Sequence, residues 1–180
     1  MRSKHRSSIG ILGGSFDPPH KGHLKISNIS LKKLKINRIY WIITKKNPFK
    51  RKPFLSLNER IKKCKTILKK NKKIELKYLD KKIKSSRTIK LIKYLKTQNG
   101  RKKIFLIIGS DNLVNFHKWL QWKKILQFCE LVVFSRKGFD QKARKSVTVK
   151  YSGNKHIIFI KNRKMDISST MLRKYYMKKK

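Results

Sequence analysis

The stretch GGSFDPPHKGHL, residues 13–24, follows the short apolar run IGIL and precedes apolar residues that recur at helical spacing. The apolar run is typical of a buried strand, and the later recurrence is typical of an amphipathic helix. The first turn from strand to helix is therefore expected to contain Gly13, Gly14, His20 and His23. Glycines let the backbone approach a phosphate closely, and a helix N-terminus attracts anions. The stretch predicts a cradle for the phosphates of a nucleotide.

The rest of the chain continues to alternate short apolar runs with amphipathic segments. Strands are predicted at residues 38–44, 74–79, 104–108, 131–134 and 157–160, with a further short strand at 147–149 inside a basic, loop-like stretch at 136–153. Helices are predicted from a capping box at Ser56 and Glu59, from Thr88, and from about Ser169. Such alternation predicts right-handed crossovers and a parallel sheet covered on both faces.

The fold class predicted is therefore α/β, with a single Rossmann-like, doubly wound parallel sheet. The run at 104–108 is the most apolar and is expected at the centre of the sheet. We expect one domain over residues 1–180, with a basic extension at 1–8 and a basic tail at 178–180. Ligands of such sheets bind at the carboxyl ends of the strands, so the turns after the strands are the candidates for function.

The net charge of +43 comes from 51 Lys and Arg against 8 Asp and Glu. A field of this sign draws in anionic ligands. The cations are mostly lysines, 40 of them, spread over every segment, which fits a bias toward AT-rich codons better than a nucleic-acid surface. We expect no specific nucleic-acid partner.

No apolar run approaches the roughly 20 residues that a membrane-spanning helix needs. The basic N-terminus leads directly into the glycine stretch and does not resemble a signal peptide, so a cytoplasmic protein without a membrane partner is expected. Cys64 and Cys129 lie in apolar stretches and are expected to be buried free thiols.

The spacing of His20 and His23 leaves metal ligation and a plain core position open. No other histidine, cysteine or carboxylate lies at a good ligand spacing, so no protein metal site is predicted.

Four segments together resemble the HxGH nucleotidyltransferases, and within them the bacterial nicotinate-nucleotide adenylyltransferases. They are residues 13–24, LIIGSDNL at 106–113, HKWLQW at 117–122 and DISSTMLR at 166–173, and the resemblance runs from residue 9 to about residue 176. It implies transfer of AMP from ATP to nicotinate mononucleotide, which gives deamido-NAD and pyrophosphate. It also implies Mg²⁺ bound with ATP, held mainly by phosphates and water.

The resemblance implies catalytic roles for His20, His23 and Arg173. The ATP-binding residues that it implies are Gly13, Gly14, Ser15, Phe16, His20, His23, Gly109, Asp111, Ser168, Ser169, Thr170 and Arg173. Those that it implies for nicotinate mononucleotide are Asp17, Lys50, Thr88 and Trp119. Asp17 is equally suited to bracing the first loop, and Trp119 and Trp122 are equally suited to the core.

The segment around Thr88 departs from the family's usual Tyr-Thr-x-Asp-Thr, because Arg87 replaces the tyrosine and Lys90 the aspartate. The added positive charge is compatible with an acid as acceptor. The alternatives are nicotinamide mononucleotide or pantetheine phosphate as acceptor, or a basic nucleic-acid-binding domain that has lost catalysis. Pantetheine-phosphate enzymes usually carry threonine in place of His20 and a single glycine. Monomer and homodimer both remain open.

Overall fold

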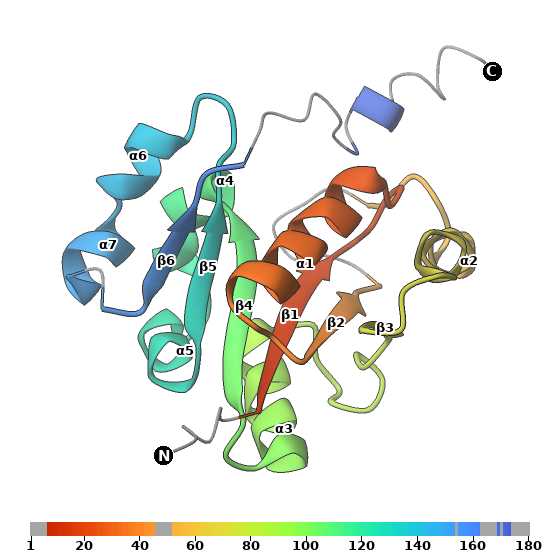
Figure 1. Cartoon of the computed structure of the whole chain (residues 1–180), viewed down its shortest axis with the longest axis horizontal. Coiled ribbons are helices and arrows are strands. Elements are labelled where there is room, and N and C mark those ends of the chain that lie inside the picture. Colours follow the sequence, from red (N-terminus) through yellow and green to blue (C-terminus); the bar gives the residue numbers. More distant parts are fainter. Residues whose placement is uncertain (1–6, 46–51, 154, 163–168, 170, 174–180) are drawn as a thin grey trace.

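The computed structural model describes residues 7–45, 52–153, 155–162, 169 and 171–173. Within these residues, six parallel strands form one sheet in the order β3-β2-β1-β4-β5-β6 (Figure 1). The strands are β1 Ser8–Gly14, β2 Arg38–Ile43, β3 Ile74–Lys77, β4 Lys103–Gly109, β5 Glu130–Phe134 and β6 Ile157–Ile160. The predicted α/β class with a doubly wound parallel sheet is confirmed.

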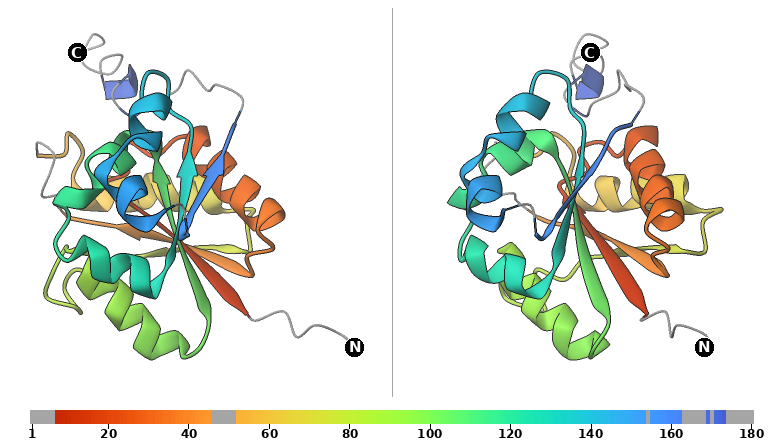
Figure 2. Two further views of the ribbon diagram at one scale, coloured as in Figure 1. Left: turned by 90° about the vertical axis from the view of Figure 1, so that its left-hand side faces the viewer. Right: turned by 60° about the vertical axis from the view of Figure 1, so that its left-hand side comes forward.

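Helices cover both faces of the twisted sheet (Figures 1 and 2). One face carries α1 Lys21–Lys33 and α2 Leu57–Leu68. The other carries α3 Thr88–Asn99, α4 Ser110–Val114, the 3-10 helix η1 Phe116–Lys118, α5 Trp122–Phe128, α6 Asp140–Arg144 and α7 Val147–Ser152. The predicted capping box starts α2, since the Ser56 hydroxyl accepts the Glu59 N–H at 3.3 Å and the Glu59 carboxylate accepts the Ser56 N–H at 2.8 Å.

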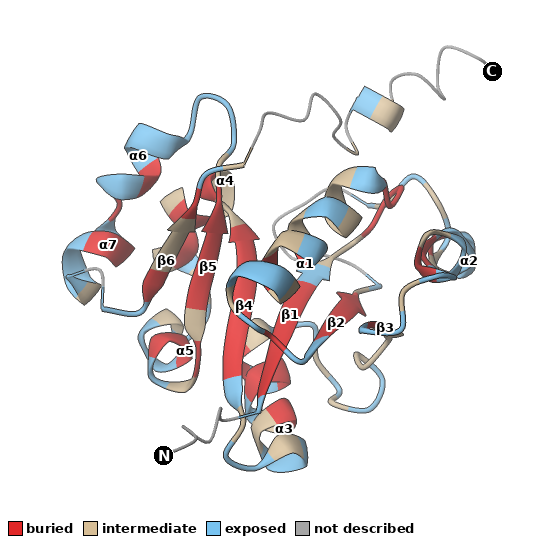
Figure 3. Cartoon of the chain, viewed as in Figure 1, coloured by how far each residue is buried: buried red, intermediate tan, exposed pale blue. Residues whose placement is uncertain are grey.

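Two cores lie on the two faces, and each central strand contributes to both (Figure 3). In β4, Ile104, Leu106 and Ile108 pack under α3 to α7, and Phe105 and Ile107 pack under α1 and α2. A strand buried on both faces has no polar side to show, so it reads as a continuous apolar run. The predicted central position of this run is confirmed, because β4 lies between β1 and β5.

The strand predicted at 147–149 is wrong, and so is the description of 136–153 as loop-like. These residues contain α6 and α7, and Ser146 caps α7 by accepting the Val149 N–H at 3.5 Å. In α7, Val149 is buried while Val147 is half exposed. A three-residue valine–threonine–valine pattern is too short to distinguish the period of a strand from that of a helix. The cap and the packing against the core therefore decide for a helix.

Cys64 and Cys129 are confirmed as buried free thiols. Burial raises the pKa of each thiol to about 12, so both are poor nucleophiles at neutral pH. Among the described residues, no helix has the length and apolar character that crossing a bilayer requires.

Candidate active site

The candidate site lies at the carboxyl edge of the sheet, the upper edge in Figure 1, where β1 and β4 are neighbours. The chain leaves β1 toward β2 on one side and leaves β4 toward β5 on the other. The connecting segments therefore diverge at this point and leave a crevice, which is where ligands of doubly wound sheets bind.

The glycine pair belongs to the end of β1 rather than to the turn that was predicted to contain it. Gly13 and Gly14 pair with Ile42 and Ile43 of β2, and the turn itself is residues 15–20. A Cβ on Gly13 would meet no atom within 4 Å, so the strand presents bare backbone to the crevice. The absence of a side chain there keeps that space available to a ligand.

His20 and His23 form the N-terminal cap of α1. The His20 Nδ1 accepts the Gly22 N–H at 3.1 Å, and the His23 Nδ1 accepts the His20 N–H at 3.3 Å. This is a capping box built from two imidazoles, and their ring centroids lie 4.0 Å apart. Because both Nδ1 atoms accept, the proton of each neutral imidazole lies on Nε2.

Burial, with the positive charge of Arg136, lowers the pKa of His20 from 6.5 to about 4. The residue is only 7% exposed. His20 is therefore neutral at pH 7, which its role as a cap acceptor requires. It offers an oriented N–H dipole rather than a full charge.

This lowered pKa predicts a stability effect in acid. The folded state prefers neutral His20, so its contribution is complete above pH 6.5 and is lost as the pH falls toward 4. His20→Asn keeps a good N-cap that does not titrate. We expect the unfolding free energy of the wild type, relative to His20→Asn, to fall by on the order of 2 kcal/mol between pH 7.5 and pH 4.5. Urea denaturation of both proteins at the two pH values measures this, and a constant difference would contradict it.

Aromatic rings fix the orientation of His23. Phe16, which is 2% exposed, lies 4.9 Å from the His23 ring and stacks on Trp41 at 4.9 Å. The Trp41 Nε1–H donates to the Ser27 hydroxyl of α1 at 2.9 Å. The side chain of Phe16 therefore supports His23 from the core, and only its backbone remains to contact a nucleotide.

Asp17 is 4% exposed, and both of its carboxylate oxygens accept backbone N–H groups from the segment before α2. Phe54 donates at 2.7 Å and Leu55 at 2.9 Å. These contacts favour the interpretation that Asp17 braces the first loop, one of the two that the sequence left open.

The last described segment of the chain contacts the turn through two side chains, which we call the C-terminal clamp. The Ser169 hydroxyl donates to the Pro18 carbonyl at 3.0 Å, and the Arg173 Nη1 donates to the Asp17 carbonyl at 2.8 Å. Chain segments about 150 residues apart thus meet at the predicted phosphate site. Ser168 and Thr170 lie outside the described residues.

The predicted adenosine-side residues lie at the end of β4. A Cβ on Gly109 would come within 2.2 Å of the Asp111 Oδ1 and 3.1 Å of the Arg136 Nε, so only glycine fits without rearrangement. Arg136 lies 3.8 Å from the Asp111 carboxylate. The sequence analysis missed Arg136, and nothing in its basic surroundings distinguished it there. It brings a second cation near His20.

A cavity beside the turn lies under the carboxyl ends of β1, β2 and β4, and it encloses about 850 Å³ when its open mouth is included. Its wall includes Gly13, Gly14, Thr44, Asp80, Arg87, Thr88, Ile108 and Trp119. Thr88 and Trp119 therefore face one cavity, as the acceptor-site prediction requires. Lys90 is exposed and does not line it, and Lys50 lies outside the described residues.

Two polar groups of this cavity were also missed by the sequence analysis. The buried Thr44 Oγ1 finds no hydrogen-bond partner among the described residues, so it is available to a ligand. Burial raises the pKa of Asp80, whose carboxylate accepts the Lys45 N–H at 2.9 Å. Trp119 and Trp122 both pack against the core, and the Trp122 ring meets Tyr151 at 5.0 Å, away from the cavity. The core interpretation therefore fits Trp122, whereas Trp119 serves both core and cavity.

The donor set of the site suits anions. It consists of imidazole N–H groups, the N-terminus of α1, two arginines and hydroxyls. Within the described part of the chain, no group of three histidines, cysteines or carboxylates could hold a metal ion. The residues present therefore fit a metal only as an ion carried by a phosphate ligand.

The chain is similar to known nucleotidyltransferases in sequence and in fold. Residues 11–175 match the cytidylyltransferase-like family. A probable nicotinate-nucleotide adenylyltransferase of Pelagibacter ubique is 46% identical over 96% of this chain and 95% of its own length. One from Aquifex aeolicus is 30% identical over 89% and 98%. The solved nicotinic acid mononucleotide adenylyltransferase of Plasmodium falciparum, complexed with NaAD, superimposes with a TM-score of 0.76 at 22% identity, over 94% of this chain and 83% of that one.

Proposed function

The chain belongs to the nicotinate-nucleotide adenylyltransferases, within the cytidylyltransferase-like family, and we propose that the site at the carboxyl edge of its sheet performs their reaction. The protein transfers AMP from ATP to nicotinate mononucleotide, which gives deamido-NAD and pyrophosphate. A phosphate oxygen of nicotinate mononucleotide bonds to the α-phosphorus of ATP, and the bond from that phosphorus to the bridging oxygen breaks. The electron pair leaves with pyrophosphate, so no side chain has to form a covalent bond.

One observation carries the assignment of the site. Two imidazole Nε2–H donors at the start of α1 share the turn with Ser169 and Arg173, which come from the other end of the chain. Adenylyl transfer needs alignment of the two phosphates and neutralisation of the charge that develops on the transferred group. Fixed dipoles and cations in a partly buried site supply both.

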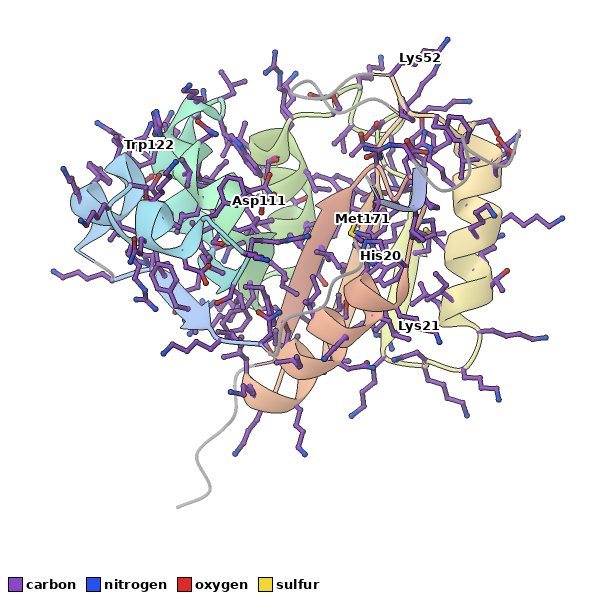
Figure 4. All side chains as sticks on the ribbon, turned by 90° about the horizontal axis from the view of Figure 1, so that it is seen from above. His20, Lys21, Lys52, Asp111, Trp122 and Met171 are labelled. Atoms are coloured by element: carbon purple, nitrogen blue, oxygen red, sulfur yellow. The ribbon has the colours of Figure 1, made fainter. Side chains whose placement is uncertain are left out.

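The roles follow from position. His20, His23 and the α1 N-terminus contact the ATP phosphates, and Arg173 grips phosphate oxygens with its planar fork. Gly109 leaves room for the adenosine, whose ribose hydroxyls meet Asp111. The nicotinate ring enters the cavity between Thr88 and Trp119, with its carboxylate toward Arg87. Mg²⁺ arrives as part of the substrate, MgATP, and its ligands are phosphates and water. Asp111 belongs to α4 and His20 caps the start of α1, and both are labelled in Figure 4.

The acceptor preference is tested by pyrophosphate release from ATP with nicotinate mononucleotide, nicotinamide mononucleotide or phosphopantetheine. We expect the highest kcat/KM with the nicotinate form. Arg87→Tyr restores the residue that is usual in the family. It should lower the ratio of kcat/KM for nicotinate mononucleotide to kcat/KM for nicotinamide mononucleotide several-fold. The fold should stay intact, because Arg87 is exposed. Efficient turnover of nicotinamide mononucleotide without turnover of the nicotinate form would overturn the substrate assignment.

A further inference from the structure

Arg60 is a cation that the reaction described above does not use. It lies in α2, where its charged neighbours are exposed, yet it is only 2% exposed and is among the largest fully buried side chains. Because burying a charge is costly unless it is fully hydrogen-bonded, its position requires an explanation.

All three guanidinium nitrogens of Arg60 donate to backbone carbonyls. The Nη1 donates to Ser15 at 2.7 Å and to Thr44 at 2.8 Å, the Nε to Leu55 at 3.1 Å and the Nη2 to Lys45 at 3.2 Å. These carbonyls come from three separate segments. They are the turn after β1, the end of β2, and the residues just before α2.

The same segments are joined to each other by backbone contacts. The Thr44 N–H donates to the Gly14 carbonyl at 3.1 Å, which holds the end of β2 against the end of β1. Both backbone polar groups of Leu55 are hydrogen-bonded, since its N–H donates to Asp17 and its carbonyl accepts from Arg60. Arg60 thus lies at the centre of a hydrogen-bond network that includes the turn after β1 and the cavity wall.

Stability alone is a weak reason for a charge in this position. A buried ionic group can often be replaced by an apolar one of similar volume at little cost in stability. No carboxylate lies within ion-pair distance of Arg60 among the described residues, so carbonyl dipoles are its direct partners. What the planar fork supplies is direction, since it fixes where Ser15 lies relative to Thr44.

We propose that Arg60 is a positioning residue for adenylyl transfer. Its guanidinium sets the phosphate turn, through Ser15, against the cavity wall, through Thr44 and Lys45, so that the bound acceptor phosphate and the α-phosphate of ATP are aligned. This proposal rests on the proposed function. An error of about 1 Å in such an alignment costs on the order of 10²-fold in rate.

The test compares Arg60→Lys with Arg38→Lys. Lysine keeps the charge but loses the fork, and Arg38 is a half-exposed arginine at the start of β2, at the opposite edge of the sheet. We expect Arg60→Lys to lower kcat by about 10- to 100-fold, with the KM for ATP changed less than about threefold, because alignment is lost while phosphate contacts remain. Arg38→Lys should retain wild-type kinetics.

A second variant separates positioning from folding. Arg60→Ala leaves a cavity that methylguanidinium can enter, and we expect added methylguanidinium to raise its kcat several-fold more than an equal concentration of sodium chloride. Circular dichroism measures the folded fraction in each condition. A wild-type kcat for Arg60→Lys, or a kcat for Arg60→Ala that follows the folded fraction without rescue, would overturn the proposal. Absence of deamido-NAD formation by the wild type would instead overturn the proposed function.

Discussion

His23→Ala is expected to lower kcat by about 10²- to 10³-fold, the usual cost of removing one fixed donor that stabilises transition-state charge. The His23 Nδ1 accepts the His20 N–H, so the proton of the neutral ring is on Nε2, and this is the donor that we propose for the phosphates. Phe16 and Trp41 hold the ring in place, so the donor is oriented before substrate arrives. The rate is measured as pyrophosphate release at saturating ATP and nicotinate mononucleotide.

Two further variants make this result specific. His23→Glu retains an acceptor for the His20 N–H but has no donor and adds negative charge, so it should be at least as slow as the alanine variant. His156→Ala removes an exposed histidine just before β6, at the amino edge of the sheet and away from the site, and should leave kcat unchanged. Near-normal turnover by a well-folded His23→Ala would refute the mechanism.

Arg173→Ala is expected to lower kcat/KM for ATP by about 10²-fold, because a charge-assisted, two-pronged contact with phosphate is lost. Arg173→Lys should recover only part of this loss, since lysine is a point charge without the fork. The measurement is initial rate against ATP concentration at saturating acceptor.

The clamp has a structural alternative that the same experiment addresses. Arg173 donates to the Asp17 carbonyl and lies 3.7 Å from the Asp17 carboxylate, so its loss could also loosen the turn. Loosening alone would raise the KM for both substrates and lower the melting temperature. Arg101→Ala, which removes an exposed arginine at the opposite edge of the sheet, controls for the change in net charge. Unchanged kinetics in Arg173→Ala would exclude the clamp.

The fold was predictable because its signals are local. Continuous apolar runs such as 104–108 report strands buried on both faces, and the Ser56–Glu59 capping box reports a helix start within four residues. The failures were local ambiguities. Residues 147–149 are too few to distinguish the two-residue period of a strand from the 3.6-residue period of a helix. The boundary between strand and turn at Gly14 depends on pairing with Ile43, which is distant in sequence.

The site was only partly predictable for a related reason. His20 and His23 are three residues apart, so their place in one turn was predictable, whereas their joint cap of α1 was not. Arg60 and Arg136 could not, because each is one cation in a chain with 51 of them, and neither stands in a recognisable pattern. Only the folded environment distinguishes them. Arg60 is buried among backbone carbonyls, and Arg136 lies beside the end of β4.

By itself the sequence determined the alternation of strand and helix, the parallel sheet and the turn that contains His20 and His23, because these depend on periodicity and caps within a few residues of each other. The tertiary structure alone decided which cations contact the turn after β1. The contacts of Arg60 with Ser15 span 45 residues and those of Arg173 with Asp17 span 156. Such pairs are brought together by the strand order 3-2-1-4-5-6, which gathers the carboxyl ends of distant strands at one edge, and no local pattern records that order.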